Sequence, residues 1–220
     1  MTAKTYKSKP RRRVIRPAKT GSARDAIGKL EPGCEIFCFT FGQFSLIDAL
    51  CYLVDQTGPA EVTLATWTAA DADLTRAKAL LAGAQIRSMR YIVDRSFLTR
   101  KPEYCQAMRE LFGDDCIRTV RSHSKWAVIS NDQWKLAIRT SMNLNHNPRL
   151  ENLEISDDPA LCQFFTTVAD DLFAEQQVGI FDGELPKLES VENVAVAGRP
   201  SAGKIDPRNI KAPMVGTLQT

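Results

Sequence analysis

The sequence of 220 residues lacks the long apolar segments of membrane and secreted proteins. No stretch reaches the roughly 18 uninterrupted apolar residues of a membrane span, and the N-terminal segment has no apolar run of the length that a signal peptide requires. We therefore expect a soluble, cytoplasmic protein that does not act on a membrane.

Cysteine and histidine are too few and too scattered to indicate a metal site. The six cysteines include no C-x-x-C pair, and the only histidines, His123 and His146, lie outside any ligand-like spacing with them. An even number of cysteines permits disulfides, but several lie within apolar runs, which favours buried free thiols. The sequence thus predicts no metal and no cofactor.

Acidic residues are absent from the first 24 positions, although the whole chain carries 26 of them. Eight basic residues lie between positions 4 and 19 instead: Lys4, Lys7, Lys9, Arg11, Arg12, Arg13, Arg16 and Lys19. This composition, with almost no large apolar side chain, predicts a disordered basic arm at 1–22. Such an arm is typical either of a solvated localisation segment or of non-specific phosphate binding. Its candidate nucleic-acid contacts are Arg11, Arg12, Arg13 and Arg16.

Between the arm and residue 175, apolar periodicity predicts strands that alternate with helices. In order, the predicted elements are a strand at 34–40, a helix at 45–54, a strand at 61–67, a helix at 70–84, a strand at 86–93, a helix at 102–112, strands at 116–121, 125–130, 134–141 and 152–155, and a helix at 159–175. This order predicts one α/β domain at 23–175, a sandwich with a mixed sheet. Gly, Pro, Ser and Ala dominate afterwards, which predicts a flexible tail at 176–220. The alternative for its apolar clusters at 178–181 and 191–196 is that they dock on the domain or on a partner.

Polar side chains of several kinds gather between the later strands. His123 and Lys125 stand two residues apart on a predicted strand, so both project from one face, about 6.6 to 6.8 Å apart. Ser141 and Asn143 share a face at the end of the next strand, and hairpin pairing would bring them towards His123. Imidazole, ammonium, hydroxyl and carboxamide are therefore expected together.

These groups suit phosphoryl transfer. An imidazole can attack phosphorus or protonate a leaving alkoxide near neutral pH, and a neighbouring carboxylate can fix its tautomer. Asn152 and Glu154 lie on one face of a third extended segment and offer such a carboxylate. Lysine and asparagine can bind the phosphoryl oxygens, a task that a divalent metal performs elsewhere.

The run from His123 to Glu154 resembles the phospholipase D superfamily. The superfamily motif combines His-x-Lys, an Asp, Gly-Ser-x-Asn and a following Asn-x-Glu. Here it stands as His123-Ser-Lys125, Thr140-Ser-Met-Asn143 and Asn152-Leu-Glu154. The resemblance covers residues 23–175 and implies a phospholipase D-like α/β/α sandwich.

The resemblance also implies a role for each motif residue. His123 would be the nucleophile that forms a phosphohistidine, or the acid that protonates the leaving group. Lys125 and Asn143 would hold the phosphate, Glu154 would support a histidine, and Ser141 would line the pocket. Further substrate contacts are expected from Thr140, Arg139, Arg121 and Asn152.

Two positions depart from the motif. Thr140 stands where the superfamily has its Gly, and its branched side chain could narrow or block the phosphate pocket. Ser130 stands where the superfamily has its Asp, whose loss could relax the residues that orient the site. The motif also occurs once, which resembles the small bacterial endonucleases of the superfamily, whose site forms across a homodimer two-fold. We therefore predict a homodimer in which two His123 side chains face each other.

The predicted function is that of a metal-independent phosphodiesterase, a nuclease that cleaves DNA or RNA through a phosphohistidine intermediate at the dimer interface. Nucleic acid is the expected partner. A catalytically inactive relative that binds nucleic acid or serves a regulatory role is the alternative, since Ser130 and Thr140 depart from the motif.

Overall fold

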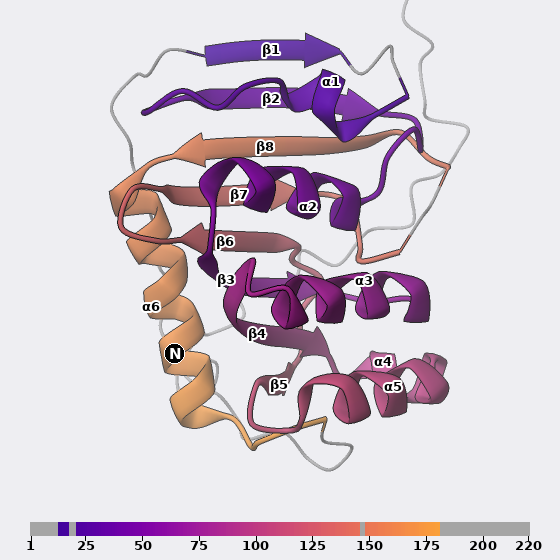
Figure 1. Cartoon of the computed structure of the whole chain (residues 1–220). Coiled ribbons are helices and arrows are strands. Elements are labelled where there is room, and N and C mark those ends of the chain that lie inside the picture. The colour runs from indigo at the N-terminus through magenta and orange to yellow at the C-terminus, as the bar shows by residue number, and fades with distance from the viewer. Residues whose placement is uncertain (1–12, 18–20, 146–147, 181–220) are drawn as a thin grey trace, which may run out of the picture. The chain divides into compact units, whose positions relative to one another are not determined.

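An eight-stranded mixed β-sheet runs through the computed structural model, which describes residues 13–17, 21–145 and 148–180. The strands are β1 (Arg13–Pro17), β2 (Glu35–Thr40), β3 (Ala60–Thr66), β4 (Ile86–Asp94), β5 (Ile117–Val120), β6 (Trp126–Ser130), β7 (Lys135–Thr140) and β8 (Glu151–Asp157). Their order in the sheet is β1-β2-β8-β7-β6-β3-β4-β5 (Figure 1). The predicted α/β architecture with a mixed sheet is confirmed.

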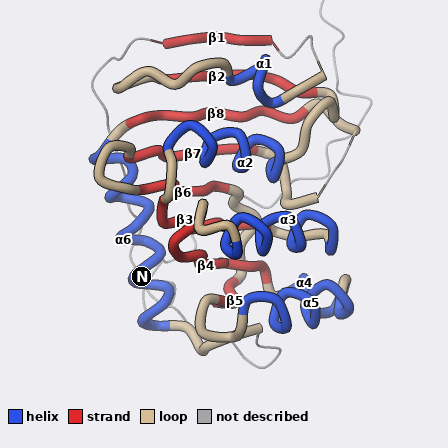
Figure 2. Tube along the Cα trace, in the orientation of Figure 1, coloured by secondary structure: helices blue, strands red, loops and turns tan. Residues whose placement is uncertain are grey.

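Helices pack on both faces of this sheet. They are α1 (Ala23–Ile27), α2 (Leu46–Thr57), α3 (Asp71–Ala82), α4 (Ser96–Arg100), α5 (Pro102–Phe112) and α6 (Pro159–Glu175). Figure 2 shows α2, α3 and α5 in succession over one face. None of the helices in the described part is apolar over a length that could cross a membrane.

The main core lies between the sheet and α2, α3 and α5. Alternate strand residues face it, as strand geometry requires, among them Ile138 of β7 and Leu153 and Ile155 of β8, all fully buried. The intervening positions face the other way, where Trp126 of β6 stacks on Phe165 of α6 with ring centroids 4.9 Å apart. This alternation decides which polar residues can share a site.

Helix α2 begins with a capping box. The Ser45 hydroxyl accepts from the Asp48 amide, and the Asp48 carboxylate accepts from the Ser45 amide at 2.7 Å. Burial by itself raises the pKa of Asp48, but these hydrogen bonds and the Arg76 guanidinium hold it below its ordinary value. The amino end of α2 is therefore held in one position, beside the pocket described below.

The six cysteines are free, as the sequence predicts. Cys34, Cys38, Cys105 and Cys162 are buried. Burial raises the pKa of the Cys105 thiol to about 12, so this thiol stays protonated and unreactive at neutral pH.

Strand β1 corrects the prediction for the N-terminal arm. Residues 13–17 were expected to be disordered, but they pair in parallel with β2, from Arg13 opposite Glu35 to Pro17 opposite Phe39. Pro17 is tolerated because β1 is an edge strand. The apolar pair Val14 and Ile15 is too short a signal to predict a strand whose partner lies elsewhere in the chain. The candidate contacts Arg11 and Arg12 lie outside the described residues.

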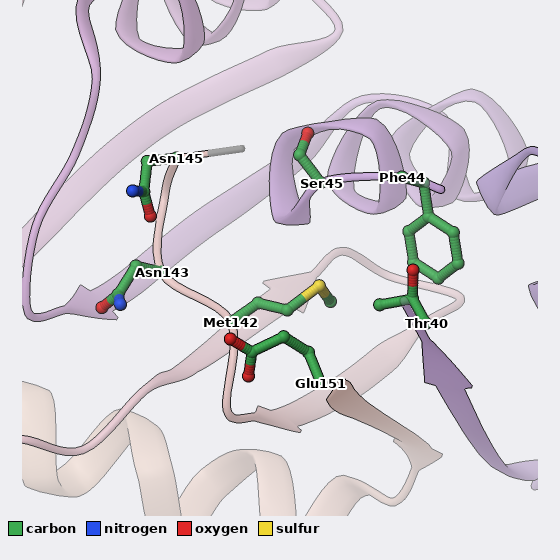
Figure 3. Close-up of a pocket in the computed structure, with 7 residues that line it drawn as sticks. All are labelled: Thr40, Phe44, Ser45, Met142, Asn143, Asn145 and Glu151. Carbon is green, nitrogen blue, oxygen red and sulfur yellow. The ribbon is translucent and has the colours of Figure 1, made fainter. Parts of the chain in front are cut away.

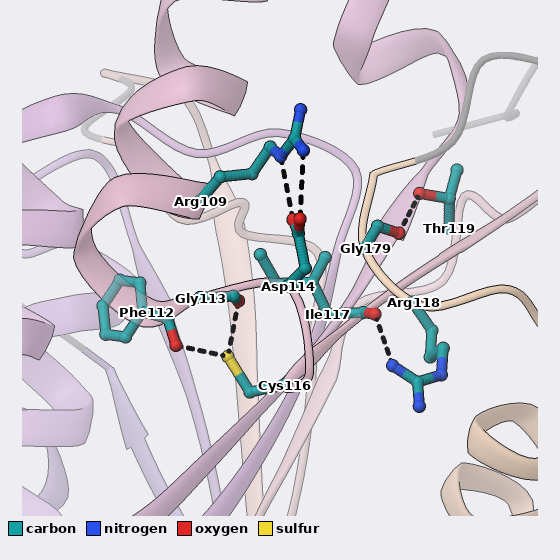
Figure 4. A network of polar contacts seen from close by, with 9 residues as sticks. All are labelled: Arg109, Phe112, Gly113, Asp114, Cys116, Ile117, Arg118, Thr119 and Gly179. Atoms are coloured by element: carbon teal, nitrogen blue, oxygen red, sulfur yellow. Dashed lines mark hydrogen bonds and ion pairs between the residues drawn. The ribbon is translucent and has the colours of Figure 1, made fainter.

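The segment after α6 is not a flexible tail at its start, where the alternative of docking on the domain holds. Residues 176–180 lie along the edge strand β5 instead of leaving the domain (Figure 4). The Gly179 amide donates to the Ile117 carbonyl at 2.9 Å, and the Thr119 hydroxyl donates to the Gly179 carbonyl at 3.1 Å. The segment thus satisfies backbone groups that an edge strand leaves unpaired. Residues 181–220 lie outside the described part.

Gly179→Ala should destabilise the domain. Gly179 has a φ of +85°, and an added Cβ would lie 2.9 Å from Oδ1 of Asp114, which Arg109 holds in place. We expect the free energy of unfolding in urea to fall by about 1–2 kcal/mol. Gly21→Ala is the control, because nothing lies within 4 Å of a Cβ there and its φ is not left-handed. Equal stability of the two variants would contradict this account of the β5 edge.

Candidate functional site

The candidate site lies at one edge of the sheet. β2, β3, β4, β5 and β7 end at the edge where β6 and β8 begin, because β6 and β8 run antiparallel to their neighbours (Figure 1). Ligand sites of open α/β sheets form at the carboxyl ends of strands. The polar loops that the sequence singles out before β6 and after β7 both lie at this edge.

His123 and Lys125 precede β6 and are brought together as predicted. His123 is exposed and Lys125 is half-buried. Nζ of Lys125 donates to the His123 carbonyl at 2.8 Å and lies 3.4 Å from Nδ1 of the imidazole. Burial lowers the pKa of Lys125, and the nearby carboxylates of Glu151 and Asp94 oppose this shift. An imidazole with an adjacent cation is therefore presented to solvent.

Asp94 anchors the loop that carries His123. Its Oδ2 accepts from the Ser122 amide at 2.9 Å, and its Oδ1 accepts from the Ser96 amide at 2.9 Å. Burial by itself raises the pKa of Asp94, but the hydrogen bonds from Ser96 and Ser122 hold it below its ordinary value. One carboxylate at the end of β4 thus ties the residue before His123 to the start of α4.

Trp67, just after β3, contacts the imidazole directly. The rings of Trp67 and His123 meet edge to face, with centroids 5.3 Å apart and an interplanar angle of 60°. The guanidinium of Arg100 lies 3.5 Å from the centre of the Trp67 ring and donates to its carbonyl at 2.9 Å. Neither residue is among the predicted site residues, although Trp67 ends a predicted strand at the same edge.

Ser141 and Thr140 are held by the start of β8. The Ser141 hydroxyl donates to a carboxylate oxygen of Glu151 and accepts from the Asn152 amide at 3.0 Å. The Thr140 hydroxyl donates to the Asn152 carbonyl at 2.6 Å and accepts from the Met142 amide at 3.0 Å. The hydroxyl of Thr140 is therefore engaged by the backbone of Asn152 in β8 and of Met142 just after β7.

A small pocket opens beside these residues (Figure 3). It is lined by Thr40, Phe44, Ser45, Met142, Asn143, Asn145 and Glu151. Thr140 is not among the lining residues. The buried Oδ1 atoms of Asn143 and Asn145 have no hydrogen-bond partner in the described part of the chain. Two carboxamides and a carboxylate are thus available to a polar ligand.

The backbone just after Asn143 is tied to the end of β3. The amide of the next residue, Leu144, donates to the Thr68 carbonyl and to the Thr66 hydroxyl, both at 3.2 Å. These two threonines flank Trp67, the residue that contacts His123. The loop after β7 therefore lies beside the segment of Trp67, the residue that contacts His123.

Glu154 is not brought to His123. It pairs with Arg139 at 2.8 Å, and β-pairing aligns both with Trp126, which faces α6. Glu151 follows the parity of the core-facing residues of β8 and lies near Lys125 instead. The predicted carboxylate, Glu154, is therefore the one of the wrong parity. The run from Glu151 to Glu154 offers two carboxylates, and only the register of β8 decides between them.

Arg139, Asn152 and Ser130 also differ from their expected places. Arg139 lies on the face of the sheet opposite Lys125, and Asn152 meets the site through its backbone. Ser130 lies at the far end of β6, roughly 17 Å from Lys125 along the strand, and accepts from Nζ of Lys135 at 2.9 Å. The missing Asp of the motif therefore concerns a position remote from the imidazole.

Arg121 is exposed at the site edge, just after β5. His146 lies outside the described residues. Within the described ranges, no group of three or more His, Cys, Asp or Glu side chains is arranged to hold a metal ion.

Asp94→Asn should loosen the histidine loop. We expect the free energy of unfolding to fall by about 1 kcal/mol at pH 7, because two backbone amides lose a charged acceptor. The folded pKa of Asp94 is depressed, so its contribution is complete above the unfolded pKa of about 4 and is lost as the pH falls through the lower folded value. Urea denaturation should therefore show that the difference in the free energy of unfolding between Asp94→Asn and the wild type becomes smaller from pH 7 to pH 3.

Asp132→Asn is the control, since Asp132 is exposed in the turn between β6 and β7. We expect it to match the wild type at both pH values. If Asp94→Asn is less stable than the wild type by the same free energy at pH 3 as at pH 7, the anchoring role of the Asp94 carboxylate is contradicted.

No protein-family model matches the sequence, and no curated protein matches it. Among solved structures, the chain is similar to a phospholipase D family member, Nuc from Salmonella typhimurium, at 12% sequence identity and a TM-score of 0.46, with 66% of this chain and 96% of that chain covered. It is similar to NucT from Helicobacter pylori at 16% identity and a TM-score of 0.46, with 65% and 99% covered. Phosphatidylserine synthase from Haemophilus influenzae matches at 14% identity and a TM-score of 0.47, with 70% and 41% covered. The likeness to these structures is one of fold.

Proposed function

We propose that the protein is a metal-independent phosphodiesterase of the phospholipase D-like type that cleaves nucleic acid through His123. The observation that carries the proposal is the exposed imidazole of His123 with the Lys125 ammonium 3.4 Å from its Nδ1, at the edge of the sheet where loops of several strands meet. The resemblance of the motif in sequence supports the same chemistry.

The proposed reaction has two steps. A ring nitrogen of His123 attacks phosphorus, the bond from phosphorus to the leaving oxygen breaks, and a general acid protonates that oxygen. Water then attacks the phosphohistidine, giving up a proton to the former acid, and the phosphate monoester leaves as His123 is released. Atoms and charge balance without a further reactant.

Lys125 and Asn143 would bind the phosphoryl oxygens during both steps. A half-buried ammonium is poorly screened by water and therefore stabilises the developing negative charge more strongly than an exposed one. Glu151, and not Glu154, lies on the side of the sheet where a carboxylate can stabilise a protonated imidazole. Ser141 would position this carboxylate through its hydrogen bond.

His123 is the one histidine of the described residues, and a single imidazole cannot be nucleophile and general acid in the same step. We propose that the general acid is the His123 of a second copy of the chain, so that a symmetric homodimer builds one site from two halves. The exposure of His123 supports this, since a second imidazole needs access to the same phosphorus.

His123→Ala should abolish cleavage of single- and double-stranded DNA and RNA in EDTA. We expect a loss of at least about 100-fold, because both proton transfer and covalent catalysis depend on this side chain. Cleavage is measured with end-labelled oligonucleotides, beside His146→Ala as the control for removal of a histidine. The control should remain active.

Binding without cleavage by the wild-type protein, unchanged in His123→Ala, would overturn the proposal and favour the catalytically inactive nucleic-acid-binding relative. Loss of cleavage in His146→Ala would overturn the second copy of His123 as the source of the acid.

Mixed dimers test the two-fold site directly. When equal amounts of wild type and His123→Ala exchange subunits, random pairing leaves about one quarter of the dimers with both histidines. Cleavage should therefore fall to about one quarter of that of the same total amount of wild type. Retention of one half would show that each chain acts alone.

A further inference from the structure

We infer that a second surface of the protein binds the phosphates that flank the cleaved one, and that the substrate is therefore a nucleic-acid strand and not a small diester. This surface consists of Arg95, Arg100, Lys101 and Arg121, and we call it the α4 basic surface. The position of the cut relative to this surface rests on the proposed function. Binding of a strand to the α4 basic surface depends only on the charge of that surface.

The α4 basic surface is assembled at the ends of two neighbouring strands. Arg95 follows β4 and its amide donates to the carbonyl of Val120, the last residue of β5, at 2.8 Å. Arg121 comes directly after Val120, so the backbones of Arg95 and Arg121 lie side by side. Helix α4 then leads from Arg95 to the remaining two basic residues.

The surface is continuous with the candidate site. Arg100, at the end of α4, stacks on Trp67 at 3.5 Å, and Trp67 contacts the imidazole of His123. Arg95 is also adjacent to Asp94, whose carboxylate holds the loop of His123. A chain of phosphates that enters at His123 would therefore meet the α4 basic surface next.

Three of the four cations of this surface have no ion pair within the described part of the chain. Residues 95–101 include three basic residues and no acidic one. Arg95, Lys101 and Arg121 are exposed, and no described carboxylate forms an ion pair with any of them. Exposed cations close together repel one another, and a polyanion relieves this repulsion and releases its own counterions.

The dimensions fit several phosphates. Three strand spacings separate β6, which Lys125 precedes, from β5, which Arg121 follows. At about 4.8 Å per spacing this is roughly 14 Å. This span is longer than the 3.4 Å of axis that each phosphate of a duplex strand occupies, so the surface can reach phosphates beyond the cleaved one. Binding should thus depend on the length of the oligonucleotide.

The test is the salt dependence of binding, measured by fluorescence anisotropy of a labelled 15-nucleotide strand in EDTA. The catalytically silent His123→Ala protein serves as the background, so that no cleavage interferes. In the His123→Ala protein, the double change Arg95→Ala and Lys101→Ala should weaken binding of the strand about tenfold at low salt. The slope of log K against log salt should shrink by about 0.7 to 0.9 per lost phosphate contact.

Arg87→Ala is the matched control. Arg87 is an exposed arginine of the same strand β4, at the opposite edge of the sheet from Arg95. Arg87→Ala removes one positive charge, as Arg95→Ala and Lys101→Ala each do. It should leave the slope of log K against log salt unchanged. A dinucleotide, whose single phosphate cannot lie beside His123 and on the α4 basic surface at once, should bind the double variant and its background equally.

Three outcomes would overturn the inference. In the first, the double variant keeps the slope of the background. In the second, Arg87→Ala reduces the slope as much per charge as the double change. In the third, polyglutamate of matched length displaces the strand as readily as unlabelled nucleic acid, which would indicate a surface for acidic protein. Failure of the proposed function gives a different result. If the wild type does not cleave but the double variant still loses binding to the strand, the α4 basic surface binds nucleic acid although the proposed reaction is wrong.

Discussion

The antiparallel pairing of β6 with β3 is the constraint on which the site depends. It aligns Trp126 with Ala65, so that the chain just before β6 emerges beside Trp67 and the end of β4. A shift of one residue would turn Lys125 towards α6 and Trp126 into the main core, because side chains alternate along a strand. The buried residues of β6 on both faces of the sheet, Ala127 and Ile129 on one and Trp126 and Val128 on the other, make such a shift costly.

The histidine loop combines an exposed side chain with a fixed backbone. His123 itself is open to solvent, whereas Asp94 holds the preceding residue and Trp67 contacts the ring. A nucleophile that meets a bulky substrate needs both properties: access, and little freedom to lose when the reaction geometry forms. Charge differs between the two regions, since two carboxylates lie near Lys125, whereas Arg95, Lys101 and Arg121 are exposed and form no ion pair with a described carboxylate.

The two departures from the sequence motif have different structural consequences. Ser130 lies at the far end of β6 and bonds to Lys135, so the absent carboxylate removes nothing that touches the imidazole. Thr140 lies close to the site, but its hydroxyl joins β7 to β8 through the backbone of Asn152 and stays out of the lining of the pocket. Neither substitution obstructs His123 or Lys125 in this arrangement.

The sequence by itself determined the order of the main helices and strands and the meeting of His123 and Lys125, because apolar periodicity and spacing along one strand are local properties. Only the tertiary structure decided that Glu151 and not Glu154 joins the site, and that Trp67, Asp94 and Arg100 surround the histidine loop. It also placed residues 13–17 against β2 and residues 176–180 against β5. Each of these outcomes depends on the register and order of strands that are distant in the chain, and such long-range pairing leaves no mark on the spacing of neighbouring residues.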